Sequence, residues 1–433
     1  MTLASNSGFT ASSKKPLPSR QNRNEVYLLL FIALVVRVAW MVIAPRSAYS
    51  VDLKDWRIVA ASLLNGANPY HDYRVLNWPP LWPEILYMLA QVSDRLNWDF
   101  FLCVRLTLIT IELVLIAAAH GLIRQIDESA RPFRFILLGL CLNPLLILLT
   151  LQLGNFDALA MVGVLLFLRS LIRFRRTGQV IDWLWAACWL GLGVYAKTFP
   201  FILTPLLACG AKRLSNNTRI LGAALLAGPA LLSMGPLYVL NPIDIWQGVL
   251  GYRSTPGEFG VSGLIVLFHG ATETVDRYAH FYTMGLMVGL VVLTVVLWRF
   301  NIRRDSDLIL LAALLLLSLF MLGPGYGPQY WFWVVPLFVS LYLFQSRAYR
   351  RLLLWAGIIL LVTTLLELTL HPVYGAFIYP WTEKNKIIGV LNWFNDVRNL
   401  SLMNVPMFIA ALLVTAVGIS VLVGYHDQDS AAR

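Results

Sequence analysis

The feature that most constrains this chain is its succession of long apolar runs. A transmembrane α-helix needs about 17 to 25 mainly apolar residues to cross the hydrocarbon core of a bilayer. Counting the shorter segment 198–211 as a further crossing, the sequence predicts an all-α polytopic membrane protein with about 12 transmembrane helices. The eleven longer runs lie at 25–44, 101–123, 133–151, 155–173, 182–197, 219–240, 279–299, 307–323, 329–345, 352–370 and 402–424.

The composition supports the same class of protein. Hydrophobic residues make up 58% of the chain and charged residues only 13%, which is too apolar for the surface of a soluble domain. The net charge of +11 does not indicate nucleic acid, because excess Lys and Arg in a membrane protein are typical of cytoplasmic loops beside anionic headgroups. We therefore expect contacts with membrane lipids and none with nucleic acid.

The positive-inside rule predicts the topology. If the N-terminus is cytoplasmic, residues 1–24 form a disordered basic tail, 25–424 a single transmembrane domain and 425–433 a short cytoplasmic tail. This placement puts every basic cluster on the cytoplasmic side. The clusters are Arg124/Arg131/Arg134, Arg169/Arg173/Arg175/Arg176, Lys212/Arg213/Arg219, Arg299/Arg303/Arg304 and Arg347/Arg350/Arg351.

The predicted topology holds only if segment 79–93 does not cross the membrane. This segment is short and contains Glu84, so a re-entrant or surface-lying helix is physically reasonable. The alternative is a thirteenth span, which would reverse half of the protein against its charge bias. If 79–93 is not counted as a span, three loops rich in acidic and aromatic residues lie on the outer face, at 45–100, 241–278 and 371–401.

The first outer loop contains the leading catalytic candidate. Asp52 and Asp55 begin a stretch, DLKDWRIVAASLLNG, whose apolar residues follow helical spacing, so we expect an interfacial helix that stops at Gly66. Helix capping alone also explains this pair of acids, with Asp52 as N-cap and Asp55 as the third residue of the first turn. The spacing of the acids does not separate the two interpretations.

Several short motifs, taken in order along the chain, resemble those of a known family. The chain resembles the polyprenyl-phosphate-sugar-dependent membrane glycosyltransferases of the GT-C fold, and most closely the family 87 mannosyltransferase-like proteins. The motifs are Asp52, Gly66-Ala67-Asn68-Pro69-Tyr70, Trp78-Pro79-Pro80-Leu81, Gln152-Leu153-Gly154-Asn155-Phe156-Asp157, Lys197-Thr198-Phe199-Pro200 and Pro328-Gln329-Tyr330.

The resemblance implies an inverting transfer of a sugar, with mannose expected, from a polyprenyl-phosphate donor to a lipid-linked or glycan acceptor. It places the protein in a bacterial plasma membrane with its site on the outer face. A carboxylate held within hydrogen-bond reach of the acceptor hydroxyl can act as general base. The family spacing assigns this role to Asp52, because Asp55 falls where the family commonly has an apolar or aromatic residue.

The leaving phosphate needs positive charge or hydrogen-bond donors at the outer face. Lys197 meets this need beside Pro200 in a broken helix, although a lysine snorkelling to the headgroup level is the alternative. Other outer-face cations are Arg57, Arg74, Arg253 and Arg277. The full set assigned to substrate binding is Asp55, Tyr70, His71, Asn155, Asp157, Lys197, Gln329 and Tyr330.

Other interpretations remain open for several of these residues. Asn155 and Asp157 also suit a tight turn that caps a helix start. Gln329 and Tyr330 follow a glycine-rich loop that suits either close approach to a ligand or an ordinary turn. Among the histidines, His71 and His371 lie on the outer side, where each could touch substrate.

Two further features concern the protein as a whole. Charge is costly within the spans, where Arg37, Arg105, Glu112 and Glu367 lie, and Arg37 and Glu112 could pair inside the bundle. The cysteines, histidines and acids show no metal-ligand spacing, and no cofactor is implied. The alternative function is a transporter or flippase of lipid-linked sugars, but such proteins usually carry internal repeats and polar residues near the bilayer midplane.

Overall fold

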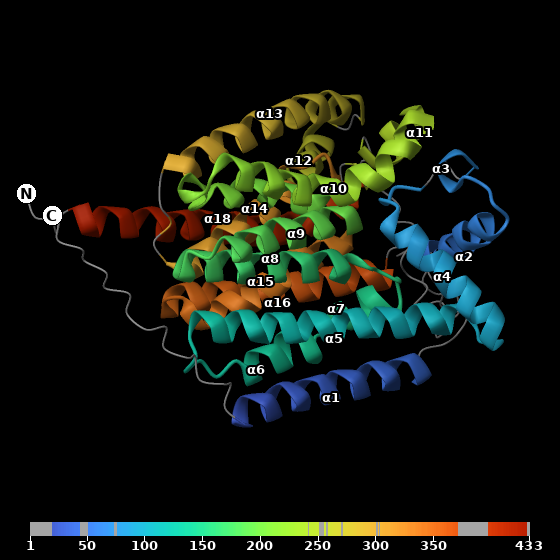
Figure 1. Ribbon diagram of the computed structural model, residues 1–433, viewed down its shortest axis with the longest axis horizontal. Helices are drawn as coiled ribbons and strands as arrows, with labels where there is room; N and C mark the ends of the chain where they lie inside the picture. The colour runs from blue at the N-terminus through green and yellow to red at the C-terminus, as the bar shows by residue number, and fades with distance from the viewer. Residues whose placement is uncertain are drawn as a thin grey trace, which may run out of the picture.

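The computed structural model describes residues 20–43, 51–72, 76–240, 242–250, 255–256, 259–269, 272–299, 302, 304–370 and 397–430. The all-α prediction is confirmed, since helices make up nearly all of this part of the chain (Figure 1). In the first half they are α1 (Arg20–Ile43), α2 (Val51–Leu64), α3 (Pro69–Asp72), α4 (Leu81–Leu96), α5 (Phe100–Ile126), α6 (Phe133–Ile136), the π-helix η1 (Leu137–Cys141), α7 (Pro144–Leu151), α8 (Asp157–Thr177), α9 (Val180–Ala196) and the 3₁₀-helices η2 (Phe199–Ala208) and η3 (Ala211–Arg213).

The second half of the described chain is also mainly helical. Its one sheet in the described residues is a two-stranded antiparallel ladder, which pairs Thr255 with Tyr326 and Pro256 with Gly325. The elements are α10 (Asn216–Leu240), α11 (Pro242–Ile245), the π-helix η4 (Trp246–Leu250), β1 (Thr255–Pro256), α12 (Gly260–His269), α13 (Thr272–Arg299), α14 (Asp305–Leu322), β2 (Gly325–Tyr326), the 3₁₀-helix η5 (Pro328–Tyr330), α15 (Trp331–Leu341), the 3₁₀-helix η6 (Tyr342–Phe344), α16 (Arg347–Leu370) and α18 (Val397–Ser430).

Seven helices in the described residues, α1, α5, α10, α13, α14, α16 and α18, are long and apolar enough to cross a membrane. The bent pair 133–141 and 144–151 makes an eighth span if it is counted as one. Three predicted spans form shorter elements: α9 has 17 residues, η2 is a 3₁₀-helix of 10 residues, and the span predicted at 329–345 forms the shorter apolar segment Trp331–Phe344. Segment 79–93 forms most of α4, which is not among the candidate spans, and its position as a re-entrant or surface-lying helix stays a prediction. The count of 12 stays a prediction.

Helix α8 lies at the centre of the packing. Most of its apolar side chains are buried, and glycines let its neighbours approach closely. A Cβ atom on Gly163 would lie 2.9 Å from the Gly193 Cα atom of α9, and one on Gly191 would lie 2.6 Å from the Leu225 carbonyl oxygen of α10. Small residues at such contacts are a common means of packing helices where lipid surrounds them.

Arg37 and Glu112 pair inside the bundle, as the sequence predicts. The Arg37 Nε and Nη2 atoms lie 2.6 and 3.2 Å from the two carboxylate oxygens of Glu112, and both side chains are 1% exposed. Arg37 also donates to the carbonyls of Leu140 at 3.1 Å and Cys141 at 2.9 Å. The helix ends at Cys141 and Asn143 is extended before α7 begins, so Arg37 satisfies carbonyl groups at the bend.

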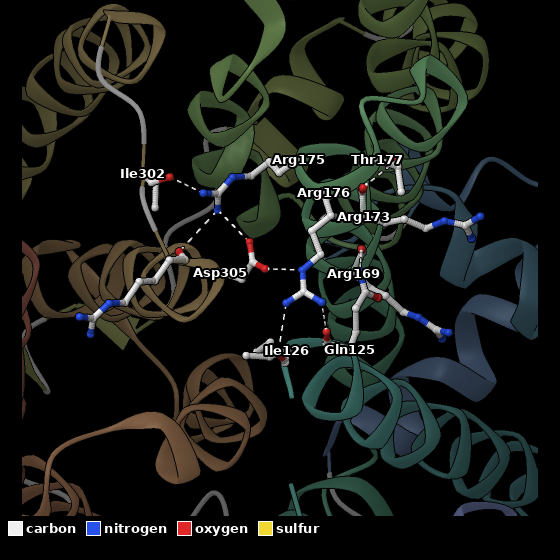
Figure 2. Close-up of polar contacts among 10 residues, drawn as sticks. Gln125, Ile126, Arg169, Arg173, Arg175, Arg176, Thr177, Ile302 and Asp305 are labelled. Atoms are coloured by element: carbon white, nitrogen blue, oxygen red, sulfur yellow. Dashed lines mark hydrogen bonds and ion pairs between the residues drawn. The ribbon is translucent and has the colours of Figure 1, made fainter. Parts of the chain in front are cut away.

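The two ends of the bundle differ in charge and content. Figure 1 shows α2, α3, α4 and α11 gathered at one end, opposite the C-terminal end of α18. At the other end, Figure 2 shows Arg175 and Arg176 converging on the Asp305 carboxylate, at 3.2 and 2.7 Å. Arg176 also donates to the carbonyls of Gln125 and Ile126. This contact ties the end of α8 to the start of α14 and the end of α5.

The buried pair should be essential to stability. Glu112→Leu should lower the free energy of unfolding by about 3–5 kcal/mol, because the Arg37 guanidinium would then be a buried charge without a counter-ion. The double variant Arg37→Leu/Glu112→Leu should recover part of this loss, because it leaves no charge buried. Unfolding of the purified protein in detergent measures both changes. A Glu112→Leu variant as stable as the unsubstituted protein would contradict this account.

Candidate active site

The turn between α7 and α8 brings two predicted motifs into contact. Gly154 in this turn has φ +78°, a left-handed backbone conformation that suits glycine. A Cβ atom at Gly154 would lie 2.7 Å from the Leu53 Cγ and Cδ2 atoms, so α2 rests directly on the turn. Asp52, next to Leu53, is thereby held beside the segment that leads into Asp157.

An aromatic cluster fastens the first outer loop to the same turn. Trp82 of α4 stacks on Phe156 with ring centroids 4.5 Å apart, and Trp56 of α2 meets Trp82 edge-on at 4.8 Å. Trp78 also meets Trp56, at 6.0 Å. Such pairs each contribute about 0.5–1.5 kcal/mol beyond the burial of their surface. The cluster therefore gives α2 and α4 a defined position over the start of α8.

Asp157 and Lys197 form an ion pair beneath this cluster. Asp157, the first residue of α8, is fully buried, and its second carboxylate oxygen accepts a hydrogen bond from Trp333 Nε1 at 2.6 Å. The Lys197 Nζ atom also lies 5.1 Å from the centroid of the Phe156 ring. A buried carboxylate is tolerated when it is paired and hydrogen-bonded in this way. Residues from α8, the end of α9 and α15 thus meet at one point.

Asn155 acts within the turn itself. Its side-chain oxygen accepts a hydrogen bond from the Asp157 backbone N–H at 2.5 Å. This bond closes a local turn of the kind that asparagine favours before a helix. Asn155 therefore has a structural role at the start of α8, and its role in substrate binding stays a prediction.

A cavity of about 830 Å³ opens above the Lys197 side chain. Lys197 and Gln329 lie at its polar part, while Leu286 and Met287 of α13 belong to its apolar part. Tyr330 also lines the cavity and stacks on Trp333 at 4.1 Å. The structure thus brings Lys197, Gln329 and Tyr330 to one cavity, with Asp157 paired to Lys197 at its edge.

The pKa of Asp52 is raised from 3.8 to about 6. The largest cause is desolvation by nearby protein atoms, although Asp52 as a whole residue is exposed. The Lys197 ammonium lowers the pKa in part, whereas Asp55 and Asp157 raise it further. Asp52 therefore lies within electrostatic reach of the Lys197–Asp157 pair. Near neutral pH its carboxylate is ionised, with a pKa suited to a general base.

The remaining predicted residues lie elsewhere or are not described. Tyr70 is buried and donates to the Trp78 carbonyl at 2.8 Å, while His71 pairs with Asp244 at 3.0 Å. Neither lines the Lys197 cavity as the described residues form it. Arg74, Arg253 and His371 lie outside the described residues.

Sequence reasoning missed several residues that shape the cavity. Trp333 holds Asp157, and Phe199 stacks on Trp333 at 4.0 Å with an interplanar angle of 8°. Asn77 and His280 also line the cavity. The only signal for Trp333 was its place just after Gln329-Tyr330, in a run that otherwise reads as an ordinary apolar helix. The described residues contain no group of three or more His, Cys, Asp or Glu side chains that could hold a metal ion.

Comparison with known proteins places the chain in a family. Residues 78–323, more than half of the 433-residue chain, match the model of glycosyltransferase family 87. The chain belongs to glycosyltransferase family 87. The matched region contains Asn155, Asp157 and Lys197, begins after Asp52 and ends before Gln329. No curated protein matches the chain. Together with the candidate spans, membership of the family makes this protein a multi-pass membrane glycosyltransferase.

The contact between Gly154 and Leu53 can be tested with a matched pair of variants. Gly178, at the other end of α8, has φ +69° and nothing within 4 Å of an added Cβ atom. Gly154→Ala and Gly178→Ala thus share the cost of the left-handed backbone, but only Gly154→Ala displaces α2. Gly154→Ala should lower the free energy of unfolding by about 1–3 kcal/mol more than Gly178→Ala does, because overpacking a site destabilises a protein by this amount. Unfolding in detergent measures the difference, and equal losses would contradict the docking of α2.

Proposed function

We propose that this protein transfers mannose from a polyprenyl-phosphate donor to a lipid-linked or glycan acceptor, with inversion and with Asp52 as general base. The observation that carries the proposal is the position of α2. Its contact with the Gly154 turn keeps the Asp52 carboxylate within electrostatic reach of Lys197, whose ammonium opens into the cavity. A base and a cation for the leaving group thus lie in one region.

The proposed step needs only groups in this region. The acceptor oxygen attacks the anomeric carbon and gives its proton to the Asp52 carboxylate. The bond between that carbon and the phosphate oxygen breaks, and the phosphate leaves with the electron pair. Attack and departure on opposite faces of the sugar invert the anomeric centre. Holding both substrates in one cavity supplies much of the rate, because it replaces a bimolecular encounter.

Lys197 is proposed to stabilise the departing phosphate. Its side chain is 19% exposed and its Nζ atom pairs with the fully buried Asp157. An ammonium has three N–H donors, so the pair with Asp157 leaves donors for a phosphate oxygen. Because Asp157 is itself held by Trp333, the ammonium has a defined position before substrate binds. Such preorganised charge is commonly the largest contribution to transition-state stabilisation.

The cavity also suits a donor with a charged head and a hydrocarbon chain. Its polar part lies at Lys197 and Gln329, while Leu286, Met287 and Leu290 of α13 extend it along an apolar helix. Among these, Met287 is 50% exposed on the outside of the bundle. We therefore assign the phosphate and sugar to the polar part and the first isoprene units to the apolar part.

The orientation belongs to the same proposal. Asp157 and Arg176 lie near opposite ends of α8, about 28 Å apart at 1.5 Å per residue, close to the thickness of the hydrocarbon core. The basic end shown in Figure 2 then faces the cytoplasm by the positive-inside rule, and the Asp52 end faces the outside. A fold of 12 spans in a bacterial plasma membrane is consistent with this arrangement.

Loss of the base should abolish transfer. Asp52→Asn should reduce the transfer of radiolabelled mannose from a polyprenyl-phosphate donor by at least about 10²-fold, the lower end of what a positioned base contributes. Asp94→Asn, on the exposed last turn of α4, is the matched control and should keep most of the activity. Undiminished transfer by Asp52→Asn would refute the assignment of the base. Absence of transfer from every polyprenyl donor would favour the transporter or flippase alternative.

The pH profile should report the ionisation of Asp52. Because its folded-state pKa is about 6, kcat/KM should fall about tenfold per unit below that pH. Stability should depend on pH in the opposite direction to activity. The ionised Asp52 carboxylate lowers the free energy of unfolding above pH 6, and this loss becomes smaller as the pH falls towards 4. The gain in stability of Asp52→Asn relative to the unsubstituted protein should therefore be largest above pH 6 and should shrink as the pH falls towards 4. Activity and melting temperature measured from pH 4 to 8 check both signs.

Lys197 should influence both rate and titration. In Lys197→Met/Asp157→Asn, no buried charge is left unpaired, so the fold should persist while kcat falls by about 10²-fold. The acid limb of the pH profile should move to higher pH, because Lys197 lowers the pKa of Asp52 more than Asp157 raises it. Arg95→Gln, on the exposed last turn of α4, controls for the loss of an outer charge. If the acid limb did not move, Lys197 would not influence the pKa of Asp52, and this part of the proposal would be contradicted.

A further inference from the structure

A second concave site lies on the outer side of α2. It is a pocket of about 570 Å³ lined by Lys54, Arg57, Ile58, Ala61 and Phe101. Four of these residues belong to α2, and Phe101 comes from the first turn of α5. As far as the structure describes the two linings, the pocket shares no residue with the Lys197 cavity. It is therefore a separate feature of the same end of the bundle.

The pocket and the buried face occupy opposite sides of α2. Its lining residues are spaced three, four and seven apart from Lys54, which places them on one face of a helix. The buried residues Leu53, Trp56 and Val59 form the other face, which packs against the Gly154 turn and the aromatic cluster. A ligand in the pocket would thus contact α2 from the side away from the cavity.

The pocket is positively charged, which favours an anionic ligand. Lys54 and Arg57 are exposed, and neither makes an ion pair with an acid of the described residues. The Arg57 guanidinium lies 5.8 Å from the centroid of the Phe101 ring, which holds its stem against the pocket wall. None of the described residues that line the pocket carries a carboxylate. Two neighbouring cations in a concave surface, with no acid of the described chain paired to them, favour a phosphate ligand.

The apolar surroundings indicate that this anion is part of a lipid. Ile58 lies in the pocket and is 50% exposed, a high value for an isoleucine. Helix α5 begins at Phe100 and is a candidate span, so the pocket lies where a membrane crossing begins. Farther along α5, Leu102 and Leu106 are each 36% exposed. A phospholipid presents a phosphate at the headgroup level and hydrocarbon chains alongside the spans below it.

We propose that the Lys54–Arg57 pocket binds the phosphate of an anionic glycerophospholipid of the surrounding leaflet, with its chains along the outside of α5. Lys54 and Arg57 contact the phosphate, and Ile58 and Phe101 contact the start of the glycerol and acyl region. Since α2 also carries Asp52, the bound lipid holds that helix in place from its outer side. The site does not depend on which sugar, donor or acceptor the enzyme uses.

Lipid binding to the full-length protein tests the proposal directly. Delipidated protein in detergent is titrated with phosphatidylglycerol or with phosphatidylcholine, and the bound lipid is counted by native mass spectrometry. We expect one phosphatidylglycerol to bind more tightly than phosphatidylcholine. In Lys54→Gln/Arg57→Gln its affinity should fall about 30-fold, as expected for the loss of two cations near a headgroup. Arg95→Gln removes an exposed charge of α4 and should leave the affinity unchanged.

Several outcomes would overturn the proposal. Equal affinity for the two lipids would show that the pocket does not recognise a phosphate with net charge. An equal loss in Arg95→Gln would show that only general surface charge acts. Displacement of the lipid by inorganic phosphate at the same concentration would show a phosphate site that ignores the hydrocarbon chains. The single variants Lys54→Gln and Arg57→Gln guard against misfolding of the double variant, and each should weaken binding by about fivefold.

Discussion

The structure depends on ion pairs that lie inside the apolar bundle. Lipid offers no water to an unpaired group, so each buried ion needs a partner within the protein. Arg37 finds Glu112 and two carbonyls of the bent segment around η1, and Asp157 finds Lys197 and Trp333. The first set stabilises a bend in the scaffold, and the second set positions a cation at the cavity. The same physical requirement thus serves both the fold and the candidate site.

The site itself is built where regular helices stop. Helix α9 ends at Ala196, and the chain continues through Lys197 into the 3₁₀-helix η2, where Pro200 and Pro205 prevent an ordinary α-helix. The loop before Gln329 contributes the opposite wall of the cavity. Irregular backbone at the edge of a membrane protein is tolerated where it lines a polar cavity, which is the position it has here. The breaks in the spans therefore provide the polar part of the cavity.

Helix α2 of the first outer loop can influence this cavity because each of its two faces makes contacts of its own. One face of α2 is fixed by Gly154 and by the stacked Trp82 and Phe156 rings, which sets the place of Asp52. The other face carries Lys54 and Arg57 in the second pocket. In the proposed enzyme, the helix that carries the base lies between the cavity and the lipid, so the membrane and the reaction share one structural element.

The sequence by itself determined the class of the protein, since apolar runs of spanning length can only be solvated by lipid, and it located Asp52, Asp157 and Lys197 as candidates. It also predicted the Arg37–Glu112 pair, because few other charges lie within the spans. Only the tertiary structure decided that Lys197 pairs with Asp157, that Trp333 holds that carboxylate, and that Asn155 closes a turn. These contacts join segments far apart in the chain, and hydrophobic periodicity carries no information about which polar groups meet. The raised pKa of Asp52 has the same origin, because it depends on the protein atoms and charges that folding places around the carboxylate.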